Sequence, residues 1–391
     1  MGEGPVLFLT GDYGSGHVQA ARALQESFTR LFPYIGTESK DFMSHAHPIV
    51  HPISKFMYLG GIKAFPRTYG YLFQKTRRSN KFSNGLKVFH GLGLGKFLSM
   101  LRSVQPSAVV STFPLAAAAM SFLRANGLFN VPTITVITDY TDHSYWINPH
   151  TDAYLVGSRH TADHLVKLGI DLSQVRVTGI PIRREYSHVY NRKEIRAKIG
   201  LTPDLPTVLV MGGGYGMLGQ EIGDTLCRYL HGNKGSMQVI AVCGHNDKLR
   251  NHLSSIASEW NLPMVVTGFT EHIPEFMATS DLLITKSGGL TSSEALAAGL
   301  PMLIYKPLPG QEEDNANYLL DAGAAVRLNH VEELLQSLSA LLSDPVRLKT
   351  MKRQAKKTGK PFSADRAAEC IVEIREQGMV TMPSSRVYSF V

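Results

Sequence analysis

The sequence has no acidic residue between Asp41 and Asp139, although this interval carries eleven Lys and Arg residues. The whole 391-residue chain has a formal net charge of +8, so the remainder of the chain sums to about −3. Between positions 56 and 101 the basic side chains alternate with nine Phe and Tyr residues. Basic residues mixed with aromatic ones are typical of a surface for anionic lipid headgroups. We therefore expect this basic aromatic region, residues 53–104, to bind anionic membrane lipids; an ordinary solvated basic face is the alternative.

Other absences narrow the class of protein further. No nucleic-acid motif accompanies the positive charge, so we expect no nucleic acid partner. No segment approaches the ~18 consecutive apolar residues of a transmembrane helix, and the first residues lack the basic segment of a signal peptide. The three cysteines, Cys227, Cys243 and Cys370, form no metal-binding pattern and fit a reducing compartment. These features predict a cytoplasmic protein that is soluble or peripheral to a membrane.

The order of apolar strands and helices predicts an α/β fold with two domains. Apolar strands separated by helix-length segments are expected at residues 6–10, 108–111, 133–138, 153–157 and 175–178, and again at 207–211, 238–243, 264–267, 282–284, 302–305 and 325–328. Such alternation is typical of parallel sheets covered by helices on both faces. We predict an N-terminal domain at 1–185, a linker at 186–206, a C-terminal domain at 207–362, and a helix and tail at 363–391. Packing of that tail against the N-terminal domain is one arrangement.

Three glycine turns follow predicted strands, at residues 11–16, 212–214 and 287–289. Free backbone N–H groups and the dipole at a helix start attract anions, and glycines let the backbone approach them closely. The first turn, G-x-x-G-x-G-H, is neither a dinucleotide fingerprint nor a P-loop, so neither NAD nor ATP is favoured. A single turn of this kind is often only a tight connection, but three of them at strand ends predict a diphosphate ligand in a cleft between the domains.

The third glycine turn carries a family resemblance. Residues 287–301, with Pro309-Gly310-Gln311-Glu312 and Asn315 after them, resemble the donor site of GT-B glycosyltransferases that use UDP-sugars, such as monogalactosyldiacylglycerol synthase. With the Gly-Ser-Gly-His at 14–17 and the spacing of Asp139, His143 and Trp146, the chain is similar to the processive diacylglycerol glucosyltransferases of family 28 up to about residue 375. The resemblance implies two Rossmann-like domains facing across a cleft, with the acceptor and the membrane on the N-terminal domain and the UDP-sugar on the C-terminal one.

The same resemblance implies the roles of site residues. Backbone N–H groups at 288–291 would hold the diphosphate, Glu294 the ribose, and Gln311 and Glu312 the sugar, while uracil would meet the backbone near 269–273. The predicted substrate-binding residues are Gly16, Gly213, Gly214, Phe269, Ile273, Ser287, Gly288, Gly289, Leu290, Thr291, Glu294, Gln311, Glu312 and Asn315. The alternatives are a capping box from Thr291 to Glu294 and a plain polar turn at Gln311-Glu312. No metal ion and no cofactor are implied, in agreement with the lack of an Asp-x-Asp motif.

Transfer to an alcohol also requires a general base. His17 is the first candidate, because a helix start disfavours the imidazolium and keeps the ring neutral. Asp139, at the end of an apolar strand, is the second candidate, and Asp41 is the third. His17 could also merely line the acceptor side of the cleft, and Asp139 could cap the following segment.

The expected function is inverting, processive transfer of glucose from UDP-glucose to 1,2-diacylglycerol at the cytoplasmic face of the cell membrane. The products would be mono- and diglucosyldiacylglycerol for membrane glycolipids and lipoteichoic acid anchors. A lipid glycosyltransferase that uses UDP-galactose or UDP-N-acetylglucosamine, a UDP-sugar epimerase and a UDP-sugar-responsive regulatory protein remain the alternatives.

Overall fold

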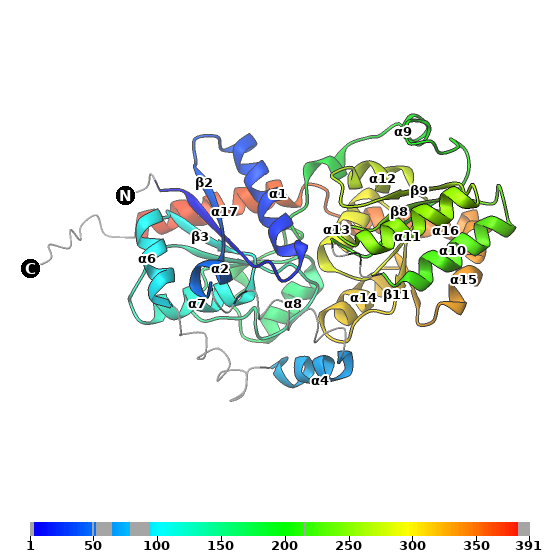
Figure 1. Cartoon of the computed structure of the whole chain (residues 1–391). Coiled ribbons are helices and arrows are strands. Elements are labelled where there is room, and N and C mark those ends of the chain that lie inside the picture. Colours follow the sequence, from blue (N-terminus) through cyan, green and yellow to red (C-terminus); the bar gives the residue numbers. More distant parts are fainter. Residues whose placement is uncertain are drawn as a thin grey trace, which may run out of the picture.

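The computed structural model describes residues 4–48, 51, 65–78, 94–214, 216 and 218–381. They form two domains side by side, and a six-stranded sheet lies at the centre of each (Figure 1). All neighbouring strands in both sheets run parallel. The prediction of two Rossmann-like α/β domains is therefore confirmed.

The N-terminal sheet has the strand order β2-β1-β3-β4-β5-β6. Its strands are β1 (Val6–Thr10), β2 (Thr37–Asp41), β3 (Ala108–Ser111), β4 (Thr133–Val136), β5 (Ala153–Leu155) and β6 (Val175–Arg176). Its helices are α1 (Ser15–Leu31), α2 (Phe42–Ala46), α4 (Pro66–Thr76), α6 (Leu94–Val104), α7 (Pro114–Ala125) and α8 (Arg159–Lys167). Strands β1, β3 and β4 are buried along their whole length, because helices cover both faces of a parallel sheet.

The C-terminal sheet has the order β12-β11-β10-β7-β8-β9. Its strands are β7 (Thr207–Met211), β8 (Gln238–Val242), β9 (Met264–Thr267), β10 (Leu282–Thr285), β11 (Met302–Tyr305) and β12 (Ala325–Leu328). Its helices are α10 (Gln220–Gly232), α11 (Asp247–Glu259), α12 (Ile273–Thr279), α13 (Gly289–Ala298), α14 (Gln311–Asp321), α15 (Glu332–Leu342) and α16 (Pro345–Thr358). Helix α9 (Arg192–Lys198) lies in the connection between the two sheets.

The last described helix, α17 (Ser363–Thr381), returns to the N-terminal domain and lies along α1 (Figure 1). Ala367, Ala368 and Ile371 are fully buried in the same apolar cluster as β1 and β3. Asp365 accepts a hydrogen bond from the Ser27 hydroxyl at 2.8 Å and forms an ion pair with Arg30. The N-terminal core therefore contains residues from both ends of the described chain.

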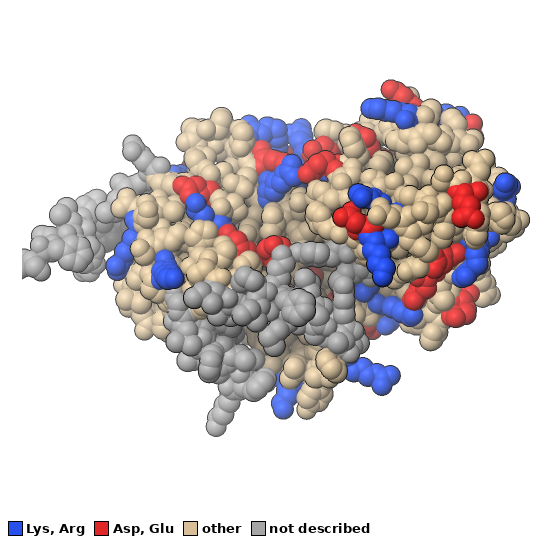
Figure 2. All heavy atoms as spheres, in the orientation of Figure 1, with Lys and Arg blue, Asp and Glu red and all other residues tan. Residues whose placement is uncertain are grey.

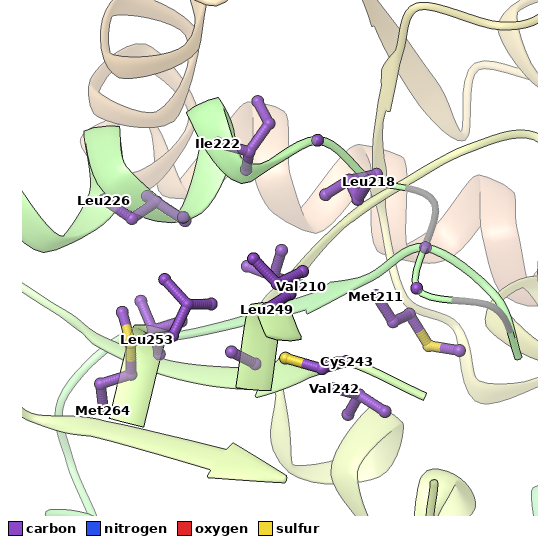
Figure 3. A pocket seen from close by; sticks show the side chains of 16 residues that line it. Val210, Met211, Leu218, Ile222, Leu226, Val242, Cys243, Leu249, Leu253 and Met264 are labelled. Carbon is purple, nitrogen blue, oxygen red and sulfur yellow. The ribbon is translucent and has the colours of Figure 1, made fainter. Parts of the chain in front are cut away.

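A small cavity lies inside the C-terminal domain between α10, α11 and the strands β7 and β8 (Figure 3). It measures about 20 Å³ and is lined by apolar side chains and glycines, including Leu226, Cys243 and Leu253. A cavity of this size and lining is too small for a nucleotide and lacks polar partners for water. It is a small apolar void within the core of the C-terminal domain. In the described part of the chain, no helix has the length and apolar character needed to cross a membrane.

Candidate functional site

The three glycine turns come together where the two domains meet. An added Cβ on Gly214 would lie 2.8 Å from Ser15 Oγ, and one on Gly16 would lie 3.8 Å from Leu290 Cβ. The closest approach is at Gly289, whose added Cβ would lie only 2.1 Å from the Thr138 carbonyl oxygen. The predicted donor turn thus lies directly against the end of β4, which brings the two sets of predicted residues into one site.

Helix α13 begins two residues before Thr291, the first residue of the alternative capping box. It starts at Gly289, and its first intrahelical hydrogen bond runs from the Ser292 N–H to the Gly288 carbonyl at 2.9 Å. Its N-cap is Gly288, which has no side chain, so the capping box from Thr291 to Glu294 is wrong. The N–H groups of Gly289, Leu290 and Thr291 belong to the first turn, where no intrahelical acceptor exists. This is the helix-start geometry that suits a phosphate.

Glu294, one turn into α13, is buried with only 9% of its surface exposed. Burial raises the pKa of its carboxyl from 4.5 to about 7, while the nearby Tyr186 hydroxyl and Arg183 guanidinium act in the opposite direction. Arg183 also donates to the Glu271 carboxylate at 2.7 Å. The carboxylate predicted to bind ribose therefore lies against the segment that connects the two domains.

Asn315 joins the domains through all of its side-chain polar atoms. Its amide nitrogen donates to Asp139 Oδ1 at 2.9 Å and to the Ser287 carbonyl at 2.8 Å. Its amide oxygen accepts from the Tyr140 backbone N–H at 2.7 Å. The Ser287 hydroxyl donates to the Glu312 carbonyl at 2.6 Å. Asn315 and Ser287 thus hold the site together through contacts with protein groups.

Asp139 lies at the point where β4, α13 and α14 meet. The pKa of its carboxyl is raised from 3.8 to about 7, mainly by burial and also by the charges of Glu312 and Asp314, while hydrogen bonds from Asn315 and the Gly289 N–H oppose the rise. A group of this pKa exists in both protonation states near neutral pH, which suits a general base. Its contacts are with the opposite domain, so they give no support to a capping role.

His17 is the third residue of α1 and lies between aromatic rings. Its ring centroid is 5.4 Å from that of Phe113 and 6.1 Å from that of Trp146. Its Nδ1 lies 3.0 Å from the hydroxyl oxygen of Thr138, the residue that precedes Asp139. Burial lowers the pKa of the imidazole from 6.5 to about 4, so the ring is neutral at physiological pH. Burial is the main cause, where the sequence suggested the helix dipole.

The third candidate base, Asp41, uses both carboxylate oxygens within the N-terminal domain. Oδ1 accepts from the Ser44 N–H at 2.7 Å and thereby caps α2, and Oδ2 accepts from the Asp12 N–H at 2.8 Å. These bonds fix the first glycine turn to the end of β2. They favour a supporting role for Asp41 over proton transfer.

Gln311 and Glu312 begin α14, so the interpretation of this pair as a plain polar turn is wrong. The Glu312 carboxylate accepts from the Leu308 N–H at 2.8 Å through Oε2. Burial raises the pKa of Glu312, and the charge of Lys286 lowers it. The Gln311 amide oxygen accepts a hydrogen bond from the Tyr69 hydroxyl of α4 at 2.6 Å.

The predicted uracil segment lies between β9 and α12. Phe269 is 48% exposed, and its ring stacks on His245 with centroids 4.7 Å apart and planes 9° apart. Ile273 begins α12. Gly213 has a φ of +70°, which favours glycine, in the turn that also holds Gly214. A flat aromatic pair next to a glycine turn suits a nucleobase.

The basic aromatic region is only partly a surface. Residues 52–64 and 79–93, which hold many of its charges and rings, lie outside the described residues. Phe97 is fully buried and Phe73 is 9% exposed, so these two rings belong to the protein interior. In contrast, Phe65 and Tyr71 are 67% and 65% exposed. Figure 2 shows a tan surface flanked by Lys and Arg at the position of α4, below the junction of the domains.

Several site residues carry no signal in the sequence that would have identified them. Arg183 and Tyr186 lie in a charge-rich connecting segment, yet they influence the pKa of the Glu294 carboxyl, more than a hundred positions away. Tyr140 stacks on Tyr318 with centroids 4.1 Å apart, and its hydroxyl lies 2.8 Å from Ser293 Oγ. Only the pairing of the two domains brings these groups together.

Comparison with known proteins agrees with this geometry. Residues 17–182 match the family model of monogalactosyldiacylglycerol (MGDG) synthase, and residues 207–367 match the glycosyltransferase family 28 C-terminal domain. The processive diacylglycerol beta-glucosyltransferase of Bacillus licheniformis is 34% identical over 90% of both chains. That of Bacillus subtilis is 33% identical over 96% of both chains.

Solved structures share the fold at lower identity. Acinetobacter baumannii MurG matches with a TM-score of 0.59 and 14% identity, covering 94% of this chain and 99% of that one. The Staphylococcus aureus MnaA–UDP structure matches with a TM-score of 0.62 and 14% identity, covering 98% and 100%. At such identities the likeness concerns the fold alone.

Proposed function

Since the chain belongs to the family of processive diacylglycerol beta-glucosyltransferases, we propose that it transfers glucose from UDP-glucose to the free hydroxyl of 1,2-diacylglycerol. The transfer proceeds with inversion, and the glycolipid product serves as the next acceptor. The observation that carries this proposal is the meeting of Gly289, at the start of α13, with Thr138 and Asp139 from the opposite domain. An anion-binding helix start and a carboxyl titrating near neutrality are thereby adjacent.

The donor is held by the C-terminal domain. The N–H groups of Leu290 and Thr291, in the first turn of α13, bind the diphosphate and stabilise the charge that develops on the leaving group, while the Gly289 N–H bonds to the Asp139 carboxyl. Glu294 accepts from the ribose hydroxyls, and the exposed ring of Phe269 supports uracil. Gln311 and Glu312 bind the sugar hydroxyls at the start of α14.

Asp139 is the general base in this proposal. The acceptor oxygen attacks the anomeric carbon, the bond from that carbon to the phosphate oxygen breaks, and UDP leaves with the bonding electrons. The hydroxyl proton passes to the Asp139 carboxylate. Its pKa of about 7 matches this task better than that of His17, at about 4, because a base works best with a pKa near the operating pH. His17, between Phe113 and Trp146, lines the acceptor side.

The acceptor reaches the site from the membrane, to which the protein binds peripherally. Helix α4 supports this arrangement, because its exposed Phe65 and Tyr71 accompany Arg67 and Lys75 without an acidic residue in the helix. Apolar rings bury in the interface of a bilayer while basic groups bind anionic headgroups.

The test measures UDP release by the purified protein given UDP-glucose or UDP-galactose, with and without diacylglycerol in anionic vesicles. Products are identified by mass. We expect release that requires both UDP-glucose and the lipid, with one or more hexoses on diacylglycerol. A preference for UDP-galactose would replace the donor and keep the mechanism. Tight UDP-sugar binding without turnover would favour a regulatory protein.

A further inference from the structure

Helix α4 contacts the segment that carries the proposed sugar-binding residues. The Tyr69 hydroxyl donates to Gln311 Oε1 at 2.6 Å, and Arg77, just after the helix, donates to both carboxylate oxygens of Asp314 at 2.9 Å. The packing is close, since an added Cβ on Gly70 would lie 2.3 Å from Pro309 Cβ. The inner face of α4 is therefore fitted to the start of α14.

The hydrogen bond from Tyr69 engages one particular atom of the Gln311 side chain, its amide oxygen. A side-chain amide has an acceptor oxygen and a donor nitrogen, and it can present either one by rotating through half a turn. Because the Tyr69 hydroxyl occupies the oxygen, the Nε2 group remains to donate to a ligand. A fixed donor recognises a sugar hydroxyl in one orientation, which a rotating amide does not do.

We infer that Tyr69 is a positioning residue for the donor sugar: by holding the Gln311 amide oxygen, it fixes the amide nitrogen as the group that reads a hydroxyl of the hexose. The inference rests on the proposed function, since Gln311 has a hexose to read only if the chain uses a UDP-sugar. Tyr69 acts through Gln311 and does not itself touch the reacting atoms.

The inference also connects the membrane side with the donor side. The outward side of the same helix carries Tyr71 and Leu72, which are 65% and 44% exposed, and its N-cap residue Phe65 is 67% exposed. The inner face holds Tyr69, and the half-buried Arg77 follows at the C-terminal end of the helix, about two turns further on. A single short helix therefore links the surface proposed to bind lipid with the residue that orients the sugar contact.

The test compares Tyr69→Phe, which removes one hydroxyl, with Tyr71→Phe on the exposed face of the same helix. Binding of UDP and of UDP-glucose is measured by calorimetry without lipid. Loss of one neutral hydrogen bond corresponds to roughly a three- to tenfold change. We expect Tyr69→Phe to weaken UDP-glucose binding by that factor and to leave UDP binding unchanged, because UDP has no hexose. Tyr71→Phe should bind both ligands as the wild type does.

Two further measurements separate positioning from a structural role. The preference for UDP-glucose over UDP-galactose, as a ratio of kcat/KM values, should fall in Tyr69→Phe at an unchanged melting temperature. In a Gln311→Ala background, Tyr69→Phe should have no further effect on either ligand. Equal weakening of UDP and UDP-glucose, or an unchanged sugar preference in an active enzyme, would overturn the inference. A wild type that releases no UDP from UDP-glucose with lipid present would instead overturn the proposed function itself.

Discussion

The Asn315 amide donates to the Asp139 carboxylate at 2.9 Å across the domain interface. Asn315 belongs to α14 of the C-terminal domain, and Asp139 follows β4 of the N-terminal one. Burial raises the pKa of Asp139, and this hydrogen bond opposes the rise. This contact between the two domains therefore lowers the pKa of the proposed base.

Replacing Asn315 should shift the pH dependence of turnover. In Asn315→Ala, Asp139 loses a hydrogen bond that favours its charged form, so its pKa should rise further above 7. We expect activity at pH 7 to fall by roughly tenfold or more and to recover partly at pH 9, as a pH profile of kcat/KM would record. Asn317→Ala, at an exposed position of the same helix, is the matched control. An unshifted profile would contradict the coupling.

The pH profile of the wild type distinguishes the two leading bases. If Asp139 takes the proton, kcat/KM rises with pH through about 7 and then levels off, because the carboxyl must be ionised. If His17 takes it, the profile is flat above about pH 5, because the imidazole titrates near 4. We expect the first result, with a folded but inactive Asp139→Asn. A His17→Ala variant that loses all turnover, together with a flat profile, would reverse the assignment.

Glu294→Gln should make the folded protein more stable at alkaline pH and weaken its binding of the donor. The folded-state pKa of Glu294 is raised from 4.5 to about 7, so the folded protein binds its proton more tightly than the unfolded chain does. The contribution of the Glu294 carboxyl to the free energy of unfolding is therefore fully present below about pH 4.5 and is lost as the pH rises through 7. At pH 8 the variant should therefore be more stable than the wild type by about 1–3 kcal/mol, with little difference at pH 4.5. Calorimetric unfolding at both pH values measures this, and UDP binding should weaken.

Vesicle binding through α4 should depend on salt. Arg67→Ala combined with Lys75→Ala should weaken binding to anionic vesicles by roughly tenfold or more at low salt, because each basic residue near such a surface contributes about 1 kcal/mol. High salt should reduce this difference by screening the charges. The pair Arg353→Ala and Lys357→Ala, exposed on α16, removes the same charge from the other domain and serves as control. Salt-independent binding by the wild type would indicate apolar insertion alone.

Gly289→Ala should separate the domains. The new methyl group would lie 2.1 Å from the Thr138 carbonyl oxygen, which is backbone and cannot rotate away. We expect an increased radius of gyration in solution scattering and strongly reduced turnover. In Gly288→Ala the added Cβ meets nothing within 4 Å, so that variant should keep the wild-type radius.

The parts of the fold that sequence predicts are those set by burial. Strands β1, β7 and β11 begin and end at the predicted residues, because largely apolar runs that follow a proline and end at a glycine or lysine mark strands buried on both faces. In contrast, β2 reads Thr-Glu-Ser-Lys-Asp and escaped prediction. It lies at the sheet edge, where polar side chains remain in water and no apolar pattern is required.

Sequence predicted the site residues that belong to local patterns, but not the contacts between residues far apart in the chain. The glycine turns, Glu294 and the Gln311-Glu312 pair follow local patterns, and the structure places them around one junction. The contacts of Asn315 with Asp139, and of Tyr69 with Gln311, span 176 and 242 positions. No local spacing encodes such pairs, because they depend on how two independently patterned domains meet.

The docking of α17 has a consequence for synthesis of the chain. Ala367, Ala368 and Ile371 complete a core that β1 and β3 begin, so the first domain to emerge from a ribosome lacks part of its interior until α17 has been synthesised. The C-terminal sheet, whose strands span residues 207–328, has no such dependence on α17 in its apolar clusters among the described residues. The C-terminal domain can therefore complete its core before the N-terminal domain does. Until α17 docks, the N-terminal domain keeps part of its apolar surface exposed.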